Sequence, residues 1–226
     1  MSRVLPILFN TEMVRAIMDG RKSCTRRLLK GPFTVHPNGY ITKPRGNENL
    51  CPYEPPYQPG DILYVRETWT EECGKYYYRA DYDSDYLDPC ETLSGGYPAS
   101  CRNHPGCDGC MATSTRIHWH PSIHMPKEAA RIWLKVTDVR VERLQSITEG
   151  GAIREGAEGE KCHHTNTGAF GCTDCMNTGW IEPPQVEFMQ IWNSTIKESD
   201  LDRYGWDANP WVWVIEFERC EKPEGV

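Results

Sequence analysis

The chain has 226 residues, of which 38% are hydrophobic and 11% are aromatic, with eight tryptophans among them. This richness in large apolar side chains excludes a disordered chain, and the length suffices for one sizeable core or for a smaller core with insertions. The formal net charge of -7 argues against broad non-specific binding of duplex nucleic acid, because a long polyanion repels an acidic protein.

The N-terminal sequence MSRVLPILFN has a short apolar run without the long apolar region and cleavage site of a secretory signal. No stretch of the chain reaches the roughly 18 apolar residues that a membrane span requires. We therefore expect a cytoplasmic protein without a membrane partner.

The first third of the chain predicts a strand, a short helix and a second strand. Residues 4–9 (VLPILF) predict the opening strand, and Thr11 is a candidate N-cap for a helix that Gly20 ends. Residues 31–59 are rich in Pro, Gly and Asn, which predicts a loop with one hairpin at most. Residues 59–69 (PGDILYVRETW) predict a turn that leads into an apolar strand.

The middle of the chain contains the first of two insertions. Residues 76–82 (YYYRADY) predict an aromatic strand beside the preceding one, and residues 83–120 are polar, Gly-rich and Cys-rich without a period, which indicates an insertion. Residues 129–144 (AARIWLKVTDVRVERL) alternate in polarity and predict one long bent strand or two consecutive strands. Ser146 and Glu149 have the spacing of a capping box and predict the start of a short helix.

The last third predicts a helix and a closing strand. Residues 157–182 form the second Cys-rich insertion, Pro183 begins a helix with an apolar face, and residues 211–218 (WVWVIEFE) give the strongest strand pattern in the chain. Together these patterns predict an α+β protein, in which residues 1–226 form a single domain. We expect a small mixed β-barrel with short flanking helices and the two insertions.

A cluster of basic residues interrupts this acidic chain. The segment GRKSCTRRLLK contains five cations within eleven residues, which predicts a local anion site: Arg21, Lys22, Arg26, Arg27 and Lys30. The side chains of Lys22 and Thr25 can point into the same pocket. Neighbouring guanidinium groups favour a neutral lysine, which can act as a base.

Four motifs follow one another along the chain: GRK with a Thr and an Arg close behind (residues 20–27), GD ahead of a strand (60–61), ITE with a Glu six residues later (147–155), and WVIEF (213–217). This pattern resembles the ASCH domain, a relative of the PUA fold, over about half of the chain. The chain is also similar to a group of phage and prophage proteins. The resemblance implies a PUA-like barrel in a bacterial cytoplasm or in a phage-infected host cell.

A small bacterial ASCH member is an amidohydrolase that removes the acetyl group from N4-acetylcytidine with a lysine, a threonine and a glutamate. On the motif, these positions fall on Lys22, Thr25 and Glu155. The resemblance implies Thr25 as the nucleophile, Lys22 as its base and Glu155 as the proton shuttle to the leaving amine. Arg26, which stands between Thr25 and Arg27, and the two insertions depart from the small enzyme and bear on the choice of substrate.

Five residues are predicted to bind the substrate: Arg21, Arg26, Arg27, Trp69 and His124. The three arginines can hold a phosphate, the tryptophan can stack on a base, and the histidine can border a nucleoside pocket. Ordinary structural roles are the alternative. The basic residues can be a solvated surface, Thr25 a turn cap and Glu155 an exposed carboxylate. The histidines of the stretch RIHWHPSIH can bind a metal, which is the alternative to a nucleoside pocket at His124.

Seven of the eleven cysteines fall in two short windows, which favours metal binding over a disulfide framework. The first window offers four thiols to a zinc ion: Cys90, Cys101, Cys107 and Cys110. The second offers three thiols and one of two adjacent histidines, His163 or His164: Cys162, His164, Cys172 and Cys175. We expect one or two structural zinc ions, with a combined site, a redox-active dithiol or a catalytic zinc as alternatives.

Three hypotheses for function follow. The first is an enzyme that acts on RNA or modified nucleosides and hydrolyses an amide on an N-acylated pyrimidine nucleoside. The second is a non-catalytic module that binds single-stranded RNA, or a ribonuclease of the same fold. The third is a phage accessory protein that binds host proteins through its zinc loops.

Overall fold

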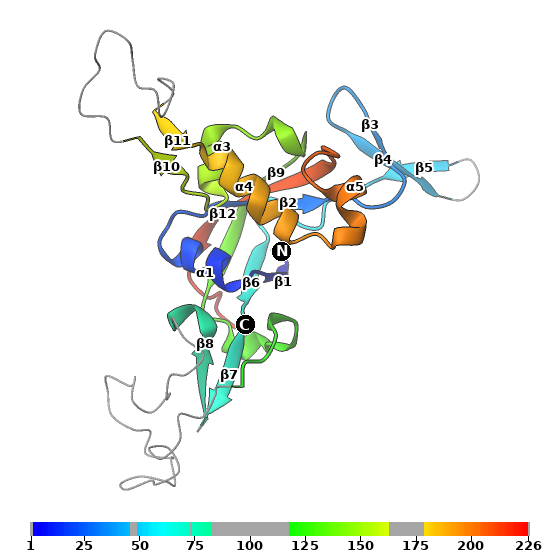
Figure 1. Ribbon diagram of the computed structural model, residues 1–226. Coiled ribbons are helices and arrows are strands. Elements are labelled where there is room, and N and C mark those ends of the chain that lie inside the picture. Colours follow the sequence, from blue (N-terminus) through cyan, green and yellow to red (C-terminus); the bar gives the residue numbers. More distant parts are fainter. Residues whose placement is uncertain (1, 46–48, 73, 83–117, 163–178, 226) are drawn as a thin grey trace, which may run out of the picture.

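The computed structural model describes residues 2–45, 49–72, 74–82, 118–162 and 179–225. Its centre is a five-stranded sheet, in which β1 runs parallel to β6 and the other neighbours are antiparallel (Figure 1). In spatial order the strands are β1 (Val4–Leu8), β6 (Ile62–Arg66), β9 (Trp133–Arg143), β12 (Trp211–Cys220) and β2 (Cys24–Leu28). With few and short helices around these strands, the fold is of the α+β class.

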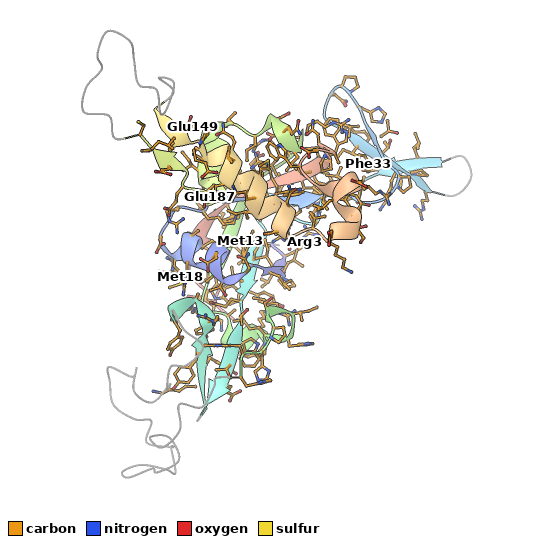
Figure 2. The ribbon with its side chains drawn as sticks, viewed as in Figure 1. Arg3, Met13, Met18, Phe33, Glu149 and Glu187 are labelled. Atoms are coloured by element: carbon orange, nitrogen blue, oxygen red, sulfur yellow. The ribbon has the colours of Figure 1, made fainter. Side chains whose placement is uncertain are left out.

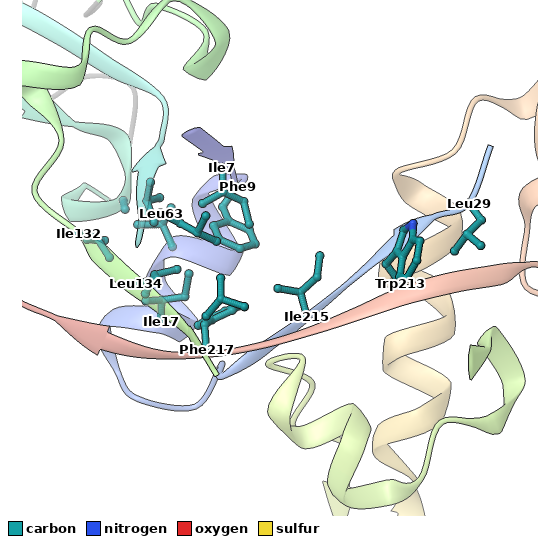
Figure 3. Packing of buried hydrophobic residues seen from close by; sticks show 14 of the residues in the cluster. Ile7, Phe9, Ile17, Leu29, Leu63, Ile132, Leu134, Trp213, Ile215 and Phe217 are labelled. Atoms are coloured by element: carbon teal, nitrogen blue, oxygen red, sulfur yellow. The ribbon is translucent and has the colours of Figure 1, made fainter. Parts of the chain in front are cut away.

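Strand β12 is covered on both faces, and its side chains explain why. They are largely β-branched and aromatic, which favours an extended chain, and successive side chains point to opposite faces. Trp213, Ile215 and Phe217 enter a first hydrophobic cluster (Figure 3), whereas Val212 and Val214 enter a second. Each buried side chain of this kind contributes about 1.5–3 kcal/mol relative to exposure.

Helices complete the two clusters. Helix α1 (Thr11–Met18) packs Val14 and Ile17 into the first cluster. Helices α3 (Glu149–Arg154) and α4 (Pro184–Ser194) pack against each other and supply the second cluster with Ala152, Phe188 and Trp192. The predicted helix after Pro183 is confirmed. Residues 129–144 contain one long strand, β9, which is the first of the two alternatives predicted there.

Two predicted helix caps are wrong. Helix α1 is capped by Asn10, whose side chain accepts a 2.8 Å hydrogen bond from an amide of the first turn, so Thr11 is already helical. Helix α3 is capped by Thr148, whose hydroxyl accepts a 3.1 Å bond from the N–H of Gly151, while Ser146 lies in a preceding 3-10 turn. In each case the side-chain oxygen next to the helix reaches the free amides first.

The region predicted as a loop with one hairpin contains a three-stranded antiparallel sheet, which we call the arm: β3 (Thr34–Val35), β4 (Ile41–Arg45) and β5 (Asn49–Pro52). The arm projects from one side of the molecule (Figure 1). Its strands are short and contain two prolines, so no period of two was visible in the sequence.

A second hairpin lies at the opposite end of the molecule from α3 and the arm (Figure 1). It pairs β7 (Trp69–Glu72) with β8 (Lys75–Tyr78). Of the aromatic strand predicted over 76–82, residues 76–78 therefore pair with β7 and not with β6 as expected, and residues 79–81 form a 3-10 turn. A third hydrophobic cluster stabilises this end: Trp69, Met125 and Ala129.

Of the described elements, the remaining strands are β10 (Glu160–Lys161) and β11 (Trp180–Glu182), which pair, and the remaining α-helix is the short α5 (Leu201–Tyr204). Across the described ranges the ladder of the central sheet ends at β1 and β2, and the closed barrel that we expected is not found there. The two edge strands are linked by a side chain, since Arg27 Nη2 donates a 2.8 Å hydrogen bond to the carbonyl of Leu8. In the part of the chain that the structure describes, no helix has the length and apolar character to cross a membrane.

Candidate functional site

Lys22 and Glu155, 133 positions apart in the sequence, form a buried ion pair. Lys22 Nζ lies 2.7 Å from Glu155 Oε2 and 2.7 Å from the backbone carbonyl oxygen of the same residue. The side chains are 0% and 5% exposed. The pair therefore joins the turn between α1 and β2 to the C-terminal end of α3, where Glu155 is the C-cap.

Gly156 makes this close approach possible. Its φ of +101° lies in the region that favours glycine, and a Cβ there would stand 3.0 Å from the Cβ of Ala16 and 3.6 Å from that of Lys22. The chain can thus pass directly over the Lys22 side chain. No glycine-specific pattern in the sequence indicated this contact.

Arg26 completes a buried triad of charges. Its Nη1 lies 3.1 Å from Glu155 Oε1, so each oxygen of that carboxylate holds one cation. Its Nη2 lies 3.4 Å from Glu142 Oε2, and Glu142 is itself held by Arg140 at 2.6 Å. Among the described residues, Arg26 Nε is buried without a hydrogen-bond partner.

Thr25 lies on the other face of β2 from Arg26. It pairs with Ile215, and Arg27 pairs with Trp213, so both side chains belong to the face of the first hydrophobic cluster. Thr25 is 3% exposed, and no hydrogen bond of its hydroxyl is found within the described ranges.

The Phe9 ring lies close to both Lys22 and Arg27. Its centroid lies 5.6 Å from Lys22 Nζ and 5.4 Å from the guanidinium carbon of Arg27, and the ring is part of the first cluster. Lys22 therefore borders the cluster toward which Thr25 faces, while it is hydrogen bonded to Glu155. Among the described side-chain contacts, Lys22 is joined to Glu155 and to the Phe9 ring, and none joins it to Thr25.

Two cavities flank this group, and each has a volume within the range of small-molecule sites. The first, of about 410 Å³, lies between α1 and α4 and takes in Glu155, with Met13 and Glu187 on its walls (Figure 2). The second, of about 400 Å³, lies between the central sheet and the segment that follows the arm, and it takes in Arg27.

The basic segment is mostly paired within the protein. Arg21 forms salt bridges of 3.1 Å with Asp19 and with Glu158, and Lys22 and Arg26 share Glu155 as described. Arg27 has a carbonyl partner, and no carboxylate pairs with it in the described part of the chain. Of the three arginines predicted to bind a phosphate, Arg27 is thus the one whose charge is left for an anion.

The other predicted binding residues lie elsewhere. Trp69 is buried in the third cluster, where its ring contacts Tyr76 and His120 at centroid distances of 5.7 and 5.3 Å. His124 is exposed in a 3-10 turn beside the same cluster. The described contacts do not bring either residue to Lys22, and their role in binding stays a prediction.

Most of the predicted zinc ligands lie outside the described residues: Cys90, Cys101, Cys107, Cys110, His164, Cys172 and Cys175. Cys162 is half-buried beside the β10–β11 pair, where its N–H donates to the carbonyl of Gly179. Within the described ranges, no group of three His, Cys, Asp or Glu side chains is positioned to hold a metal ion. The zinc sites therefore stay predictions.

Cys24 is part of the charged group. Burial, and then the nearby Glu155 carboxylate, raise the pKa of its thiol to about 12. The thiol is 1% exposed. It is therefore a protonated structural side chain at neutral pH and not a nucleophile.

Sequence reasoning missed the aromatic walls of the Arg27 cavity, which are Tyr53, Tyr57 and Trp213. The signal available was two tyrosines within the proline-rich stretch PYEPPYQPG, since binding residues are found disproportionately on loops. Glu142 was missed too, and no local signal marks it, because its role depends on its distance to Arg26 across the sheet.

Compared with family models, with curated proteins and with solved structures, the chain shows no match in any of the three. The resemblance to the ASCH domain therefore rests on the motif residues alone.

Proposed function

We propose that the protein is a hydrolase of the ASCH type that cleaves an amide on an N-acylated pyrimidine nucleoside, with N4-acetylcytidine as the reference substrate. The observation that carries this proposal is the buried 2.7 Å contact between Lys22 and Glu155, with Thr25 buried in the strand that follows. A buried ion pair adds little net stability over apolar packing, which favours a chemical role for it.

In this mechanism a proton passes from Lys22 to Glu155 across their 2.7 Å contact when the substrate binds, which makes the lysine amine a base and the carboxyl group an acid. Lys22 takes the hydroxyl proton of Thr25 as the oxygen attacks the amide carbon, and Glu155 gives its proton to the leaving nitrogen. The C–N bond breaks, and the acyl group remains on Thr25 as an ester. Glu155 then takes a proton from a water that attacks the ester, and the ammonium of Lys22 returns its proton to the threonine oxygen.

Binding of single-stranded RNA without catalysis is the second candidate. The observation that favours it is the Arg27 guanidinium beside aromatic walls, because cations and aromatic rings together hold single strands. The pairing of Arg21, Lys22 and Arg26 with carboxylates speaks against a larger phosphate site in this segment.

We further infer that the central sheet is the core of a PUA-like barrel and that the cysteine windows hold one or two structural zinc ions. The β10–β11 pair supports the second point, because it holds together the two ends of the second insertion next to Cys162. A polar loop that is closed in this way gains order from a metal, since it has little apolar surface to bury.

The test is hydrolysis of N4-acetylcytidine and a panel of N-acylated nucleosides by the purified protein. Lys22→Met and Thr25→Val should abolish turnover, whereas Lys30→Met, which changes an exposed cation of the same segment, should retain it. Circular dichroism would verify that each variant is folded. Absence of turnover by the folded wild-type protein would refute the amidohydrolase and leave RNA binding as the better account.

A further inference from the structure

The cavity at Arg27 has rigid aromatic walls. Tyr53 and Trp213 meet edge to face, with ring centroids 6.0 Å apart. The hydroxyl of Tyr53 donates a 2.9 Å hydrogen bond to the carbonyl of Lys30, and that of Tyr57 donates a 2.8 Å bond to the carbonyl of Pro6. Burial raises the pKa of Tyr57, which keeps its hydroxyl a donor. The rings are thus held in place before any ligand arrives, and they can accept a planar group at low entropic cost.

The charges at this cavity favour an anion. Removal from water lowers the pKa of Arg27, but an arginine stays protonated at any ordinary pH. It is a partly desolvated cation without a carboxylate partner in the described ranges. Lys43 of the arm is not among the lining residues, but its Nζ lies 5.1 Å from the centroid of the Tyr53 ring, and it adds a positive charge near the cavity. The carboxylate among the lining residues is that of Glu54, which is exposed at the rim.

The cavity also lies next to the proposed nucleophile. Arg27 and Thr25 are two positions apart on the same face of β2, which corresponds to about 7 Å along a strand. A ligand with its anionic group on Arg27 would therefore be bound about two strand positions from Thr25, which is 3% exposed and lies outside the lining of the cavity.

We propose that this cavity is a nucleotide site, in which the aromatic walls contact the base, Arg27 binds the phosphate, and the nearby charge of Lys43 strengthens its attraction. The substrate of the proposed hydrolase is then a phosphorylated nucleoside or a nucleotide within a strand, and not the free nucleoside. This inference rests on the proposed function for the identity of the base, whereas the phosphate preference rests on the cavity itself.

The experiment is calorimetric binding of cytidine 5′-monophosphate and of cytidine to the full chain. We expect the monophosphate to bind at least about tenfold more tightly at low salt, because a charge-assisted bond to guanidinium is strong. Arg27→Gln should remove this preference, and Lys43→Gln should reduce it. Lys75→Gln, which changes an exposed strand lysine in the hairpin at the other end of the molecule, should leave it unchanged.

Equal affinities for the two probes, binding of neither, or a preference that survives in folded Arg27→Gln would overturn the nucleotide site. Because neither probe carries an acyl group, these results do not depend on turnover. Phosphate-dependent binding without hydrolysis of any acylated compound would refute only the hydrolase. Hydrolysis of N4-acetylcytidine as fast as that of its monophosphate, with equal affinities for the probes, would refute only the nucleotide site.

Discussion

Lys22 donates two hydrogen bonds to Glu155, one to its backbone carbonyl and one to its carboxylate, and each is 2.7 Å long. The lysine thus fixes both the end of α3 and the side chain that the helix presents. Because Arg26 holds the other carboxylate oxygen, Glu155 is the centre on which two buried cations depend.

Replacing Glu155 should therefore destabilise the fold strongly. Glu155→Ala leaves Lys22 and Arg26 buried without their counterion, and we expect a loss of about 3–5 kcal/mol in the free energy of unfolding. Glu158→Ala is the matched control, since this carboxylate also pairs with an arginine but is 64% exposed, and its loss should be below about 1 kcal/mol. Urea unfolding followed by tryptophan fluorescence measures both. Equal losses would show that burial of Lys22, Arg26 and Glu155 does not make their pairing more important for stability than an exposed ion pair.

Thr25→Val should separate catalysis from stability. The substitution keeps the shape and removes a hydroxyl for which the described residues provide no hydrogen bond, so the free energy of unfolding should change by less than about 1 kcal/mol. Turnover of an N-acylated nucleoside should fall at least about a thousandfold if the hydroxyl is the nucleophile. Ser23→Ala, at a half-buried neighbour, serves as the control. Normal turnover by Thr25→Val would remove Thr25 from the mechanism.

The buried Cys24 thiol predicts a loss of stability at alkaline pH. Its pKa is about 12 in the folded protein and near 8.5 in an unfolded chain, so above pH 8.5 the unfolded state loses a proton that the folded state keeps. The folded state therefore loses stability as pH rises from 8.5 toward 12, by about 1.4 kcal/mol at pH 9.5. Unfolding curves at pH 7.5 and 9.5 should show this loss in the wild type and a loss smaller by that amount in Cys24→Ala. Identical pH dependence in both proteins would contradict the prediction.

Gly156→Ala should destabilise the contact between the end of α3 and the start of β2. The added Cβ meets positive φ and the Cβ of Ala16 at 3.0 Å, and we expect a loss of about 1–3 kcal/mol. Gly150→Ala is the matched control, because it adds the same methyl group within α3, where nothing lies within 4 Å. Because alanine is a better helix former than glycine, Gly150→Ala should leave the free energy of unfolding unchanged or raise it by up to about 1 kcal/mol. Thermal unfolding of the two variants would compare them directly.

Metal analysis tests the cysteine windows. We expect about one or two zinc ions per chain, and a lower stoichiometry in Cys107→Ser and in Cys172→Ser. Cys220→Ser should retain the full content, because Cys220 lies at the end of β12 and outside both windows. Protein purified without metal, with unchanged protease resistance after treatment with a chelator, would contradict a structural role for zinc.

The sequence by itself determined the elements whose signals are local. The alternation of apolar residues specified β9 and β12, and the Pro183 start specified α4, because these patterns depend on neighbours a few positions away. The motif around Lys22 and Thr25 could likewise be recognised from adjacent residues. The arm escaped prediction because its strands are too short to show a period.

Only the tertiary structure decided what these residues do together. The sheet order places β2 beside β12, which buries Arg26 against Glu155 and Glu142 and leaves Arg27 facing an aromatic cavity. Cations of one short segment thus differ in their pairing, since Lys22 and Arg26 are compensated by a carboxylate more than a hundred residues away, whereas Arg27 has no carboxylate partner among the described residues. Pairing of that kind depends on packing and burial, which no local pattern encodes.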